Sequence, residues 1–324
     1  PGHSTLLTGA RPARTGIIAN YWFDPGLARA DKRVYCVEDE RDPQSSSGKP
    51  VVSAAHLKVP TLGEWMKAAN PASRNVAVSA KDRAVVMMGG HAIDAGYWWQ
   101  GTGFTSFAGR EPTAAAKAAS RDAARVIGAG APALAAPAWC GARDRAVAVG
   151  DFTIGTGRFA LKRGDANAFR VSPRVDAATA DLAIRLVDEM ALGKGAAPDL
   201  LSVSFSATDY IGHAFGNEGM EMCIQMAELD KAVGRLLAAL DKRGIDYAVV
   251  LSSDHGGLDA PERLDEQAYP RAARTGSELS PKALGAEVTR TTGVRAVEGP
   301  LVYADGPSGD FYLSASLSSA ERAK

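Results

Sequence analysis

Short apolar segments that alternate with longer amphipathic ones constrain the fold of this chain more than any other feature. NVAVS (75–79), DLLSVSF (199–205) and YAVVLSS (247–253) have the length and apolar character of short buried strands. Apolar residues recur at helical spacing over 61–70, between Pro173 and Gly193, and from Met226 to Leu240. A chain that alternates in this way packs helices against a sheet in layers, so the sequence predicts an α/β fold.

Local capping signals support these helices. Thr61 is followed three residues later by Glu64, which is the pattern of a capping box. Pro173 suits the first helical position, and Gly193 and Gly244 suit the residues just beyond a helix end. The sequence therefore predicts three helices with defined ends.

Composition limits the classes of partner. The chain has 324 residues, of which 46% are hydrophobic and 23% charged, with a net charge of zero. A neutral balance predicts no nucleic acid as a stable partner, and no apolar run approaches the ~20 residues that span a bilayer. The length suits one large domain or two small ones, and a monomer is favoured.

Three cysteines are too few and too scattered for a metal knuckle. Cys36, Cys140 and Cys223 could form one disulfide in an oxidising compartment, or remain three thiols. The sequence leaves both states open, including a Cys36–Cys140 pair.

The region 94–170 has little clear periodicity. It contains the aromatic cluster Tyr97–Trp99 and an Ala/Pro-rich stretch at 128–139. We predict that this region is an insertion or cap outside the sheet. The aromatic cluster could line a pocket for a leaving group or pack the cap, and packing is favoured.

Each strand-like segment is followed by residues that carry chemistry. Lys81 and Arg83 come after the first strand, Asp209 and His213 after the second, and Asp254-His255 after the third. Ligands of open α/β sheets bind outside the carboxyl ends of the strands, so we expect these side chains to gather at one edge.

Two of these groups have metal-binding character. Asp209 and His213 are four residues apart, which places them on one face of a helical turn. Asp254 and His255 are adjacent and precede two glycines, which permit a tight turn. Singly, the first pair could be an N-cap aspartate with a surface histidine, and the second an ordinary turn. Together they predict ligands for two ions such as zinc.

The other histidines lack this context. His56 and His91 have no carboxylate or cysteine at ligand spacing, so we interpret them as structural or exposed. His3 is expected to shape the loop at the start of the chain rather than to bind metal.

Four ordered motifs carry a family resemblance. They are PGHSTLLTG (1–9), GIIAN (16–20), TDYIGH (208–213) and SSDHGG (252–257). In this order they resemble the alkaline phosphatase superfamily, in its type I phosphodiesterase/nucleotide pyrophosphatase branch. The resemblance implies a three-layer α/β/α sandwich with an inserted cap. Residues 1–324 would form one catalytic domain, incomplete at both ends.

The stretch SAKDRAVV resembles the K-x-R motif of periplasmic, phosphate-monoester-specific bacterial alkaline phosphatases. A monoester dianion carries one more charged non-bridging oxygen than a diester, and Lys81 with Arg83 would hold it. The resemblance also implies that Asn20 donates a hydrogen bond to a phosphate oxygen. Alternatively, Lys81 and Arg83 form a solvated strand end, and Asn20 lies in a turn after a buried Ile17–Ile18 pair.

The implied chemistry is phosphomonoester hydrolysis with two Zn²⁺ ions. Asp209 and His213 would bind one ion, and Asp254 and His255 the other, about 4 Å away. The phosphoryl group would pass to a threonine or serine hydroxyl and then to water. The family places that hydroxyl two residues before Pro-Gly-His, ahead of Pro1, and its late histidine ligand has no counterpart after His255. We therefore expect weak or no activity from residues 1–324 alone.

The expected substrates are small-molecule phosphate monoesters, and the expected location is periplasmic or secreted. Two other functions fit the same residues. One is a phosphodiesterase or nucleotide pyrophosphatase with the same metals. The other is a non-catalytic module that binds phosphate or metal without turnover.

Overall fold

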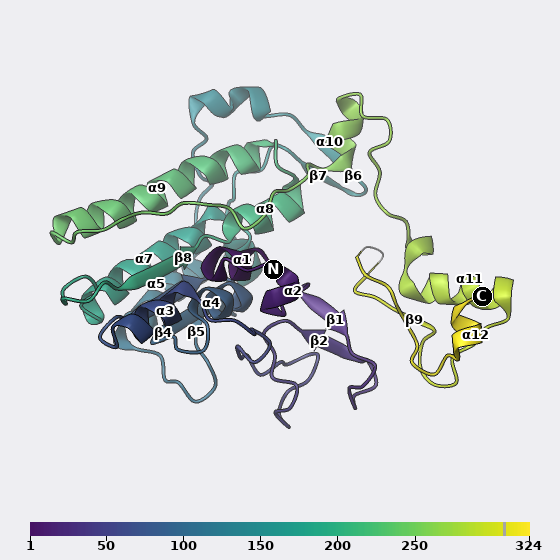
Figure 1. Ribbon diagram of the computed structural model, residues 1–324. Coiled ribbons are helices and arrows are strands. Elements are labelled where there is room, and N and C mark those ends of the chain that lie inside the picture. Colours follow the sequence, from purple (N-terminus) through teal and green to yellow (C-terminus); the bar gives the residue numbers. More distant parts are fainter. Residues whose placement is uncertain (307–308) are drawn as a thin grey trace.

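A mixed four-stranded sheet lies at the centre of the protein (Figure 1). The computed structural model describes residues 1–306 and 309–324. The strand order is β5 (Gly103–Thr105), β4 (Ala95–Gln100), β3 (Asn75–Ser79) and β8 (Leu200–Ser204). β3 runs parallel to both β4 and β8, and β5 returns antiparallel to β4.

Helices cover both faces of this sheet. The helices are α1 (Gly2–Thr8), α2 (Pro12–Thr15), α3 (Leu62–Ala69), α4 (Asp82–Gly89), α5 (Ala114–Ala129), α6 (Ala166–Arg170), α7 (Pro173–Glu189), α8 (Ala207–Phe215), α9 (Met220–Lys242), α10 (Pro261–Glu266), α11 (Pro281–Thr292) and α12 (Ser319–Arg322). Short 3-10 helices, η1 (Ala138–Arg143) and η2 (Ser277–Leu279), and three two-stranded pairs complete the elements. The pairs are β1 (Tyr21–Phe23) with β2 (Arg33–Tyr35), β6 (Val147–Val149) with β7 (Phe152–Ile154), and β9 (Val302–Tyr303) with β10 (Tyr312–Leu313).

The alternating side chains of β3 explain the layers. Val76 and Val78 face one way and pack with α5 and α7, whereas Ala77 faces the other way and packs with α4. All five residues of β3 are buried, and each fully buried valine contributes about 1.5–3 kcal/mol. The three-layer prediction is confirmed.

The predicted starts of α3 and α7 agree with the structure, whereas α7 ends at Glu189, four residues before Gly193. Thr61 and Glu64 form a reciprocal capping box at the start of α3. Ser172 caps α7, which begins at Pro173 as predicted. α9 packs against α7 on the side away from the sheet (Figure 1).

The prediction of a cap over the whole of 94–170 is wrong at its start. β4 and β5 belong to the central sheet, and α5 packs on its face. Tyr97, Trp98 and Trp99 are buried core residues of β4, so the packing interpretation of the aromatic cluster is correct. A strand buried on both faces has no polar alternation, and this removed the periodicity that would have revealed it. Only the part around η1 and the β6–β7 hairpin lies outside the sheet.

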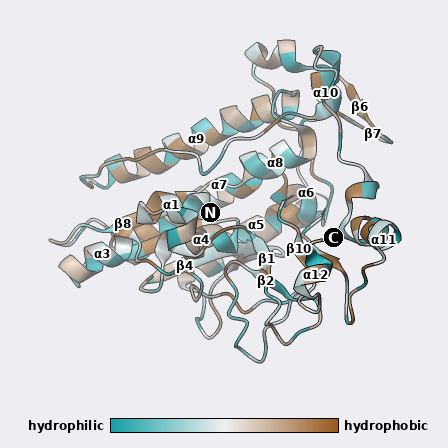
Figure 2. Ribbon diagram, turned by 45° about the vertical axis from the view of Figure 1, so that its right-hand side comes forward, coloured by the Kyte–Doolittle hydropathy of each residue, from teal (hydrophilic) through white to brown (hydrophobic). Residues whose placement is uncertain are grey.

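The prediction of a strand over 247–253 is also wrong. No ladder forms there within the described residues, and Val250 and Leu251 are 95% and 82% exposed. The segment runs as an extended trace alongside α9 (Figure 2). β8 pairs with β3 on one edge, and no described segment pairs with its other edge. Strand formation needs such a hydrogen-bonding partner, whatever the local propensity.

One disulfide joins the region outside the sheet to α9. Cys140 of η1 bonds Cys223, with a Cα–Cα distance of 5.8 Å, and Cys36 is a buried free thiol. A Cys36–Cys140 pair is therefore excluded. Among the described residues, no helix combines the length and hydropathy needed to cross a membrane.

We expect the Cys140→Ala/Cys223→Ala double variant to lose about 2–4 kcal/mol of unfolding free energy, because the bond closes a loop of 83 residues. Urea unfolding followed by far-UV circular dichroism measures this loss. Reductant should cause the same loss of unfolding free energy in the wild type. The Cys36→Ala variant should lose as much unfolding free energy on reduction as the wild type does. Equal stability of the double variant and the wild type would show that the disulfide contributes nothing.

Candidate active site

The chemistry-bearing residues gather beyond the carboxyl ends of β3 and β8. Lys81 lies two residues after β3 and occupies the N-cap position of α4. Asp209 and His213 lie on α8, which follows β8, and Asp254 and His255 come from the loop after 247–253. The predicted convergence at one sheet edge is found for these five residues.

Asp209 is at the centre of the cluster. One of its oxygens, Oδ2, accepts a short hydrogen bond from Lys81 Nζ. The other, Oδ1, lies 3.5 Å from His213 Nε2 and 3.3 Å from His255 Nε2. Burial opposes ionisation of Asp209, but the hydrogen bond and charge of Lys81, with the two imidazoles, hold its pKa below the usual value. The carboxylate is therefore ionised and surrounded by nitrogen groups.

Asp254 is held by a residue that the sequence interpretation assigned to loop shape. His3 lies in helix α1, with Nδ1 3.0 Å from Asp254 Oδ2 and Nε2 2.9 Å from Ser204 Oγ at the end of β8. Burial opposes ionisation of Asp254, yet the His3 hydrogen bond and charge keep its pKa well below the ordinary value. His255 Nε2 lies 3.7 Å from the same oxygen.

Gly2 allows α1 to approach this loop. A Cβ at Gly2 would lie 2.1 Å from the backbone oxygen of Asp254, so only glycine fits. Gly2 in the Pro-Gly-His motif therefore indicates that the chain is closely approached at this point. The motif does not say which residue approaches it, because no local spacing links it to residue 254.

Lys81 is enclosed although it is charged. Its side chain is only 7% exposed and its ammonium lies 4.9 Å from the centre of the Tyr210 ring. Desolvation lowers the pKa of Lys81, Asp209 opposes that shift, and the charge of Arg83 adds to it. The enclosure of Lys81 is not that of a solvated strand end. The charge of Arg83 acts on Lys81, but no ion pair within the described residues joins the Arg83 side chain to the cluster.

Asn20 is not joined to the cluster by any contact within the described residues. It is exposed and precedes β1, and its carbonyl oxygen accepts a hydrogen bond of 2.9 Å from the Cys36 amide. The alternative of a buried isoleucine pair is only half right, since Ile17 is buried and Ile18 is 50% exposed.

His56 and His91 lie apart from the cluster, as predicted. His56 Nε2 is 2.9 Å from Glu40 Oε2, and His91 Nδ1 is 3.2 Å from Glu64 Oε1.

The donor atoms of this cluster are of types that bind divalent metal ions, although the side chains do not converge on one point. Over residues 1–306 and 309–324, no three or more His, Cys, Asp or Glu side chains are arranged to hold a metal ion. Carboxylate oxygen and imidazole nitrogen are nonetheless common zinc ligands, and both types surround Asp209 and Asp254. The Lys81 ammonium occupies the place of a cation beside Asp209. The residues therefore fit a divalent ion, provided that Lys81 moves from Asp209.

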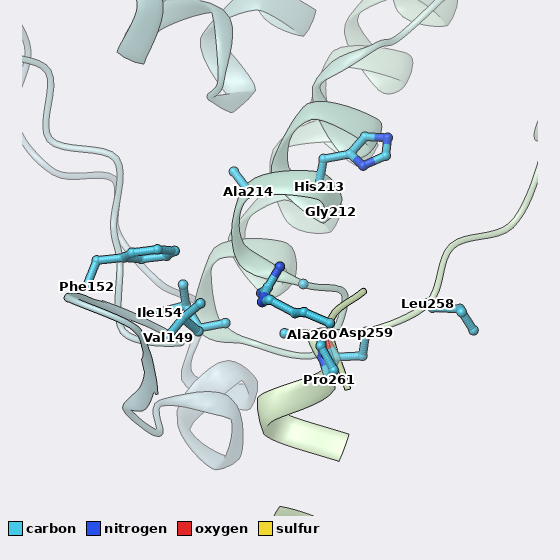
Figure 3. Close-up of a pocket in the computed structure, with 12 residues that line it drawn as sticks. Val149, Phe152, Ile154, Gly212, His213, Ala214, Leu258, Asp259, Ala260 and Pro261 are labelled. Carbon is cyan, nitrogen blue, oxygen red and sulfur yellow. The ribbon is translucent and has the colours of Figure 1, made fainter. Parts of the chain in front are cut away.

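A cavity of about 150 Å³ adjoins the cluster at His213 (Figure 3). Its walls come from the β6–β7 hairpin, the end of α8 and the turn before α10, with Arg274 as its cation. The accessible lining of this cavity is mainly polar.

A buried carboxylate lies behind the cluster and was missed by the sequence interpretation. Asp176 of α7 is 1% exposed and accepts hydrogen bonds from the Ala207 amide at 3.0 Å and from Gln225 Nε2 at 2.8 Å. Burial raises the pKa of Asp176 to about 7, although these donors and the charge of Lys81 act in the opposite direction. In sequence, Asp176 is only an acidic residue in the first turn of a helix.

The raised pKa of Asp176 predicts a pH dependence of stability. An ordinary aspartate titrates near 4, so between about pH 4 and pH 7 the folded protein retains a proton that the unfolded chain releases. This group's contribution to unfolding free energy therefore falls as pH rises through that window and is level above it. Asp176→Asn removes the titrating carboxyl group. The unfolding free energy of this variant, relative to that of the wild type, should therefore rise by up to about 4 kcal/mol between pH 4 and pH 7.

Urea unfolding at several pH values, with a chelator present throughout, measures this difference. The Asp199→Asn variant, which changes a half-buried carboxylate at the opposite end of β8, should show no such rise. Parallel pH profiles for wild type and Asp176→Asn would contradict the prediction.

Comparison with known proteins decides the family. Residues 1–272 match the family described as Type I phosphodiesterase / nucleotide pyrophosphatase. The chain belongs to this family. The match spans the Lys81, Asp209 and Asp254 motifs, so the cluster lies within the family region.

Two relatives of this phosphodiesterase-family chain are named alkaline phosphatases. The chain is 48% identical over 326 residues to alkaline phosphatase PhoK of Sphingomonas sp, covering 100% of this chain and 58% of PhoK. It is 44% identical over 331 residues to alkaline phosphatase PhoD of Zymomonas mobilis, covering 100% of this chain and 56% of PhoD. The chain thus spans a little over half the length of these relatives.

A solved relative has the same fold. The crystal structure of wild-type alkaline phosphatase PafA superposes with a TM-score of 0.80 at 23% identity, over 99% of this chain and 64% of that one. At this identity the likeness establishes the fold alone, and it agrees with the three layers described above.

Proposed function

We propose that this chain is part of a metal-dependent phosphomonoester hydrolase of the alkaline phosphatase type. The observation that carries the proposal is the enclosed Lys81, paired with Asp209 in an aspartate–histidine cluster at the carboxyl ends of β3 and β8. The names of the two bacterial relatives support the same activity. That residues 1–324 form one catalytic domain stays a prediction.

In the proposed site the metal is Zn²⁺. Asp209 with His213, and Asp254 with His255, would hold two ions, and His3 would hold Asp254 in place. Bound metal ions supply Lewis-acid activation of a phosphoryl oxygen and lower the pKa of a hydroxyl nucleophile.

The remaining residues bind the phosphoryl group. Lys81 would exchange Asp209 for a non-bridging oxygen of the substrate, and Arg83 would bind a second. Asn20 would donate to a further oxygen once the substrate or the β1 loop brings them together. Two cations match a dianion, so small-molecule phosphate monoesters are the proposed substrates, and a phosphodiesterase with the same metals is the alternative.

A location outside the cytoplasm follows from the same proposal. The Cys140–Cys223 disulfide favours an oxidising compartment, so we propose that the protein is periplasmic or secreted. The proposed protein is a monomer without a nucleic-acid partner.

Hydrolysis of 4-nitrophenyl phosphate and bis(4-nitrophenyl) phosphate by the full-length protein tests the proposal. With Zn²⁺ present, we expect kcat/KM to be at least about 10²-fold higher for the monoester. Higher kcat/KM for the diester would make the protein a phosphodiesterase. Zinc binding without turnover of either ester would make it a binding module, and both results would overturn the proposal.

A further inference from the structure

We propose that Asp176 is a positioning residue that caps α8 from the neighbouring helix α7 and so sets where Asp209 and His213 lie. The inference rests on the proposed function, because it concerns the same metal and phosphate site. Asp176 lies behind the site and makes its contacts with α8, which carries proposed ligands, and with α9, not with the ligands themselves.

α8 lacks a cap of its own. Ser206 occupies its N-cap position with φ −93° and ψ −10°, in the helical region, and its side chain makes no capping hydrogen bond. The first backbone amides of any helix need acceptors from outside that helix. Asp176 Oδ1 supplies one, since it accepts the Ala207 amide at 3.0 Å. The helix that carries Asp209 and His213 is thus capped from α7.

The second carboxylate oxygen connects α8 to α9. Gln225 Nε2 of α9 donates to Asp176 Oδ2 at 2.8 Å and to Thr208 Oγ1 at 3.1 Å. Thr208 directly precedes Asp209 in the chain. Because a carboxylate accepts through both oxygens at once, one side chain ties α7, α8 and α9 together behind Asp209.

The same network reaches the backbone of Lys81. Ser206 Oγ lies 3.0 Å from Ser79 Oγ at the end of β3, and Ser79 Oγ accepts the Lys81 amide at 3.1 Å. The start of α8 and the start of α4 are therefore joined beneath the site, while Lys81 and Asp209 are joined within it. A shift of α8 would change the separation of the proposed phosphate and metal groups.

The link at the start of α8 is a buried carboxylate. Asp176 is fully buried, forms no ion pair within the described residues, and titrates near 7 because of its burial. A buried charge costs stability unless it is compensated. A negative group at a helix N-terminus is favourable, and here the first turn of that helix carries Asp209, a proposed metal ligand.

Two substitutions at Asp176 separate positioning from simple stability. Asp176→Asn keeps an oxygen acceptor for the Ala207 amide, and Gln225 can turn its unpartnered Oε1 toward the new amide nitrogen. Asp176→Ala removes both acceptors. Asp199→Ala is the matched control, because Asp199 accepts the Arg74 and Gly193 amides, both at 2.8 Å, at the opposite end of β8.

The readouts are the Zn²⁺ dissociation constant, measured on full-length protein by competition with a chelating dye, and kcat and KM for 4-nitrophenyl phosphate. We expect Asp176→Ala to weaken Zn²⁺ binding about 10–100-fold and to lower kcat by a similar factor. Asp176→Asn should stay within about threefold of wild type in Zn²⁺ binding, because the hydrogen bond to α8 survives. Asp199→Ala should lower Tm without changing Zn²⁺ affinity.

Three outcomes would overturn the proposal. They are unchanged Zn²⁺ affinity and kcat in folded Asp176→Ala, equal losses in Asp176→Ala and Asp176→Asn, and equal losses in Asp176→Ala and Asp199→Ala. If Asp176→Ala does not fold, Gln225→Met replaces it, with an expected loss of about 3–10-fold in Zn²⁺ affinity, and no loss would refute the network. If the wild type binds Zn²⁺ but hydrolyses no monoester, the proposed function fails, while the Zn²⁺ comparison still decides the role of Asp176.

Discussion

Replacing Lys81 by alanine is expected to lower kcat/KM for phosphate monoesters by about 10²–10³-fold. The ammonium is enclosed beside Asp209, so its loss removes one of the two cations proposed for the dianion. A diester carries one charge less, and its turnover should fall less than about tenfold. Steady-state kinetics of full-length protein with both nitrophenyl esters measure the contrast.

Zinc affinity distinguishes this explanation from general damage to the site. The variant frees Asp209 Oδ2 from its ammonium partner, so Zn²⁺ binding should be unchanged or tighter. Lys67→Ala is the matched control, because Lys67 of α3 pairs with Asp94, which directly precedes β4 and so lies at the opposite end of the sheet from the site. Equal losses of kcat/KM with both esters would show that Lys81 does not distinguish the dianionic monoester from the diester.

Replacing Asp209 by asparagine is expected to remove one bound Zn²⁺ per chain and to lower kcat by on the order of 10³-fold. Asp209 contacts the side-chain nitrogen atoms of Lys81, His213 and His255, so its removal affects all three contacts at once. Metal content by atomic absorption after dialysis, with kcat on the same sample, measures the effect.

The Asp94→Asn variant is the control for that experiment, since Asp94 is also paired with a lysine. It should retain both metal ions and full activity. Retention of two Zn²⁺ ions in Asp209→Asn would show that the metal ligands lie elsewhere.

The sequence was sufficient for the elements whose stability is local. The Thr61–Glu64 capping box and the strand at 75–79 are present as predicted. The stretches SAKDRAVV, TDYIGH and SSDHGG also predicted Lys81, Asp209, His213, Asp254 and His255 as site residues, and the structure brings these side chains together. Residue type and spacing carried that information.

The local sequence pattern gave wrong predictions where the surrounding tertiary structure determined the backbone conformation. The segment 247–253 has the composition of a strand, but it pairs with no described strand and is exposed. The region after residue 94 lacks alternation because β4 is buried on both faces, and it was assigned outside the sheet. In both cases the environment of the backbone determined the structure.

The sequence by itself therefore determined the α/β layers, the candidate site residues and the family. The tertiary structure alone decided that His3 holds Asp254, that Cys140 bonds Cys223 and that Asp176 caps α8. The physical reason is the range of these contacts. His3 meets Ser204 across 201 positions, and Asp176 meets Ala207 across 31 positions. No periodicity within one helix or strand records such a contact, because only the packing of whole elements brings the two atoms within hydrogen-bonding distance.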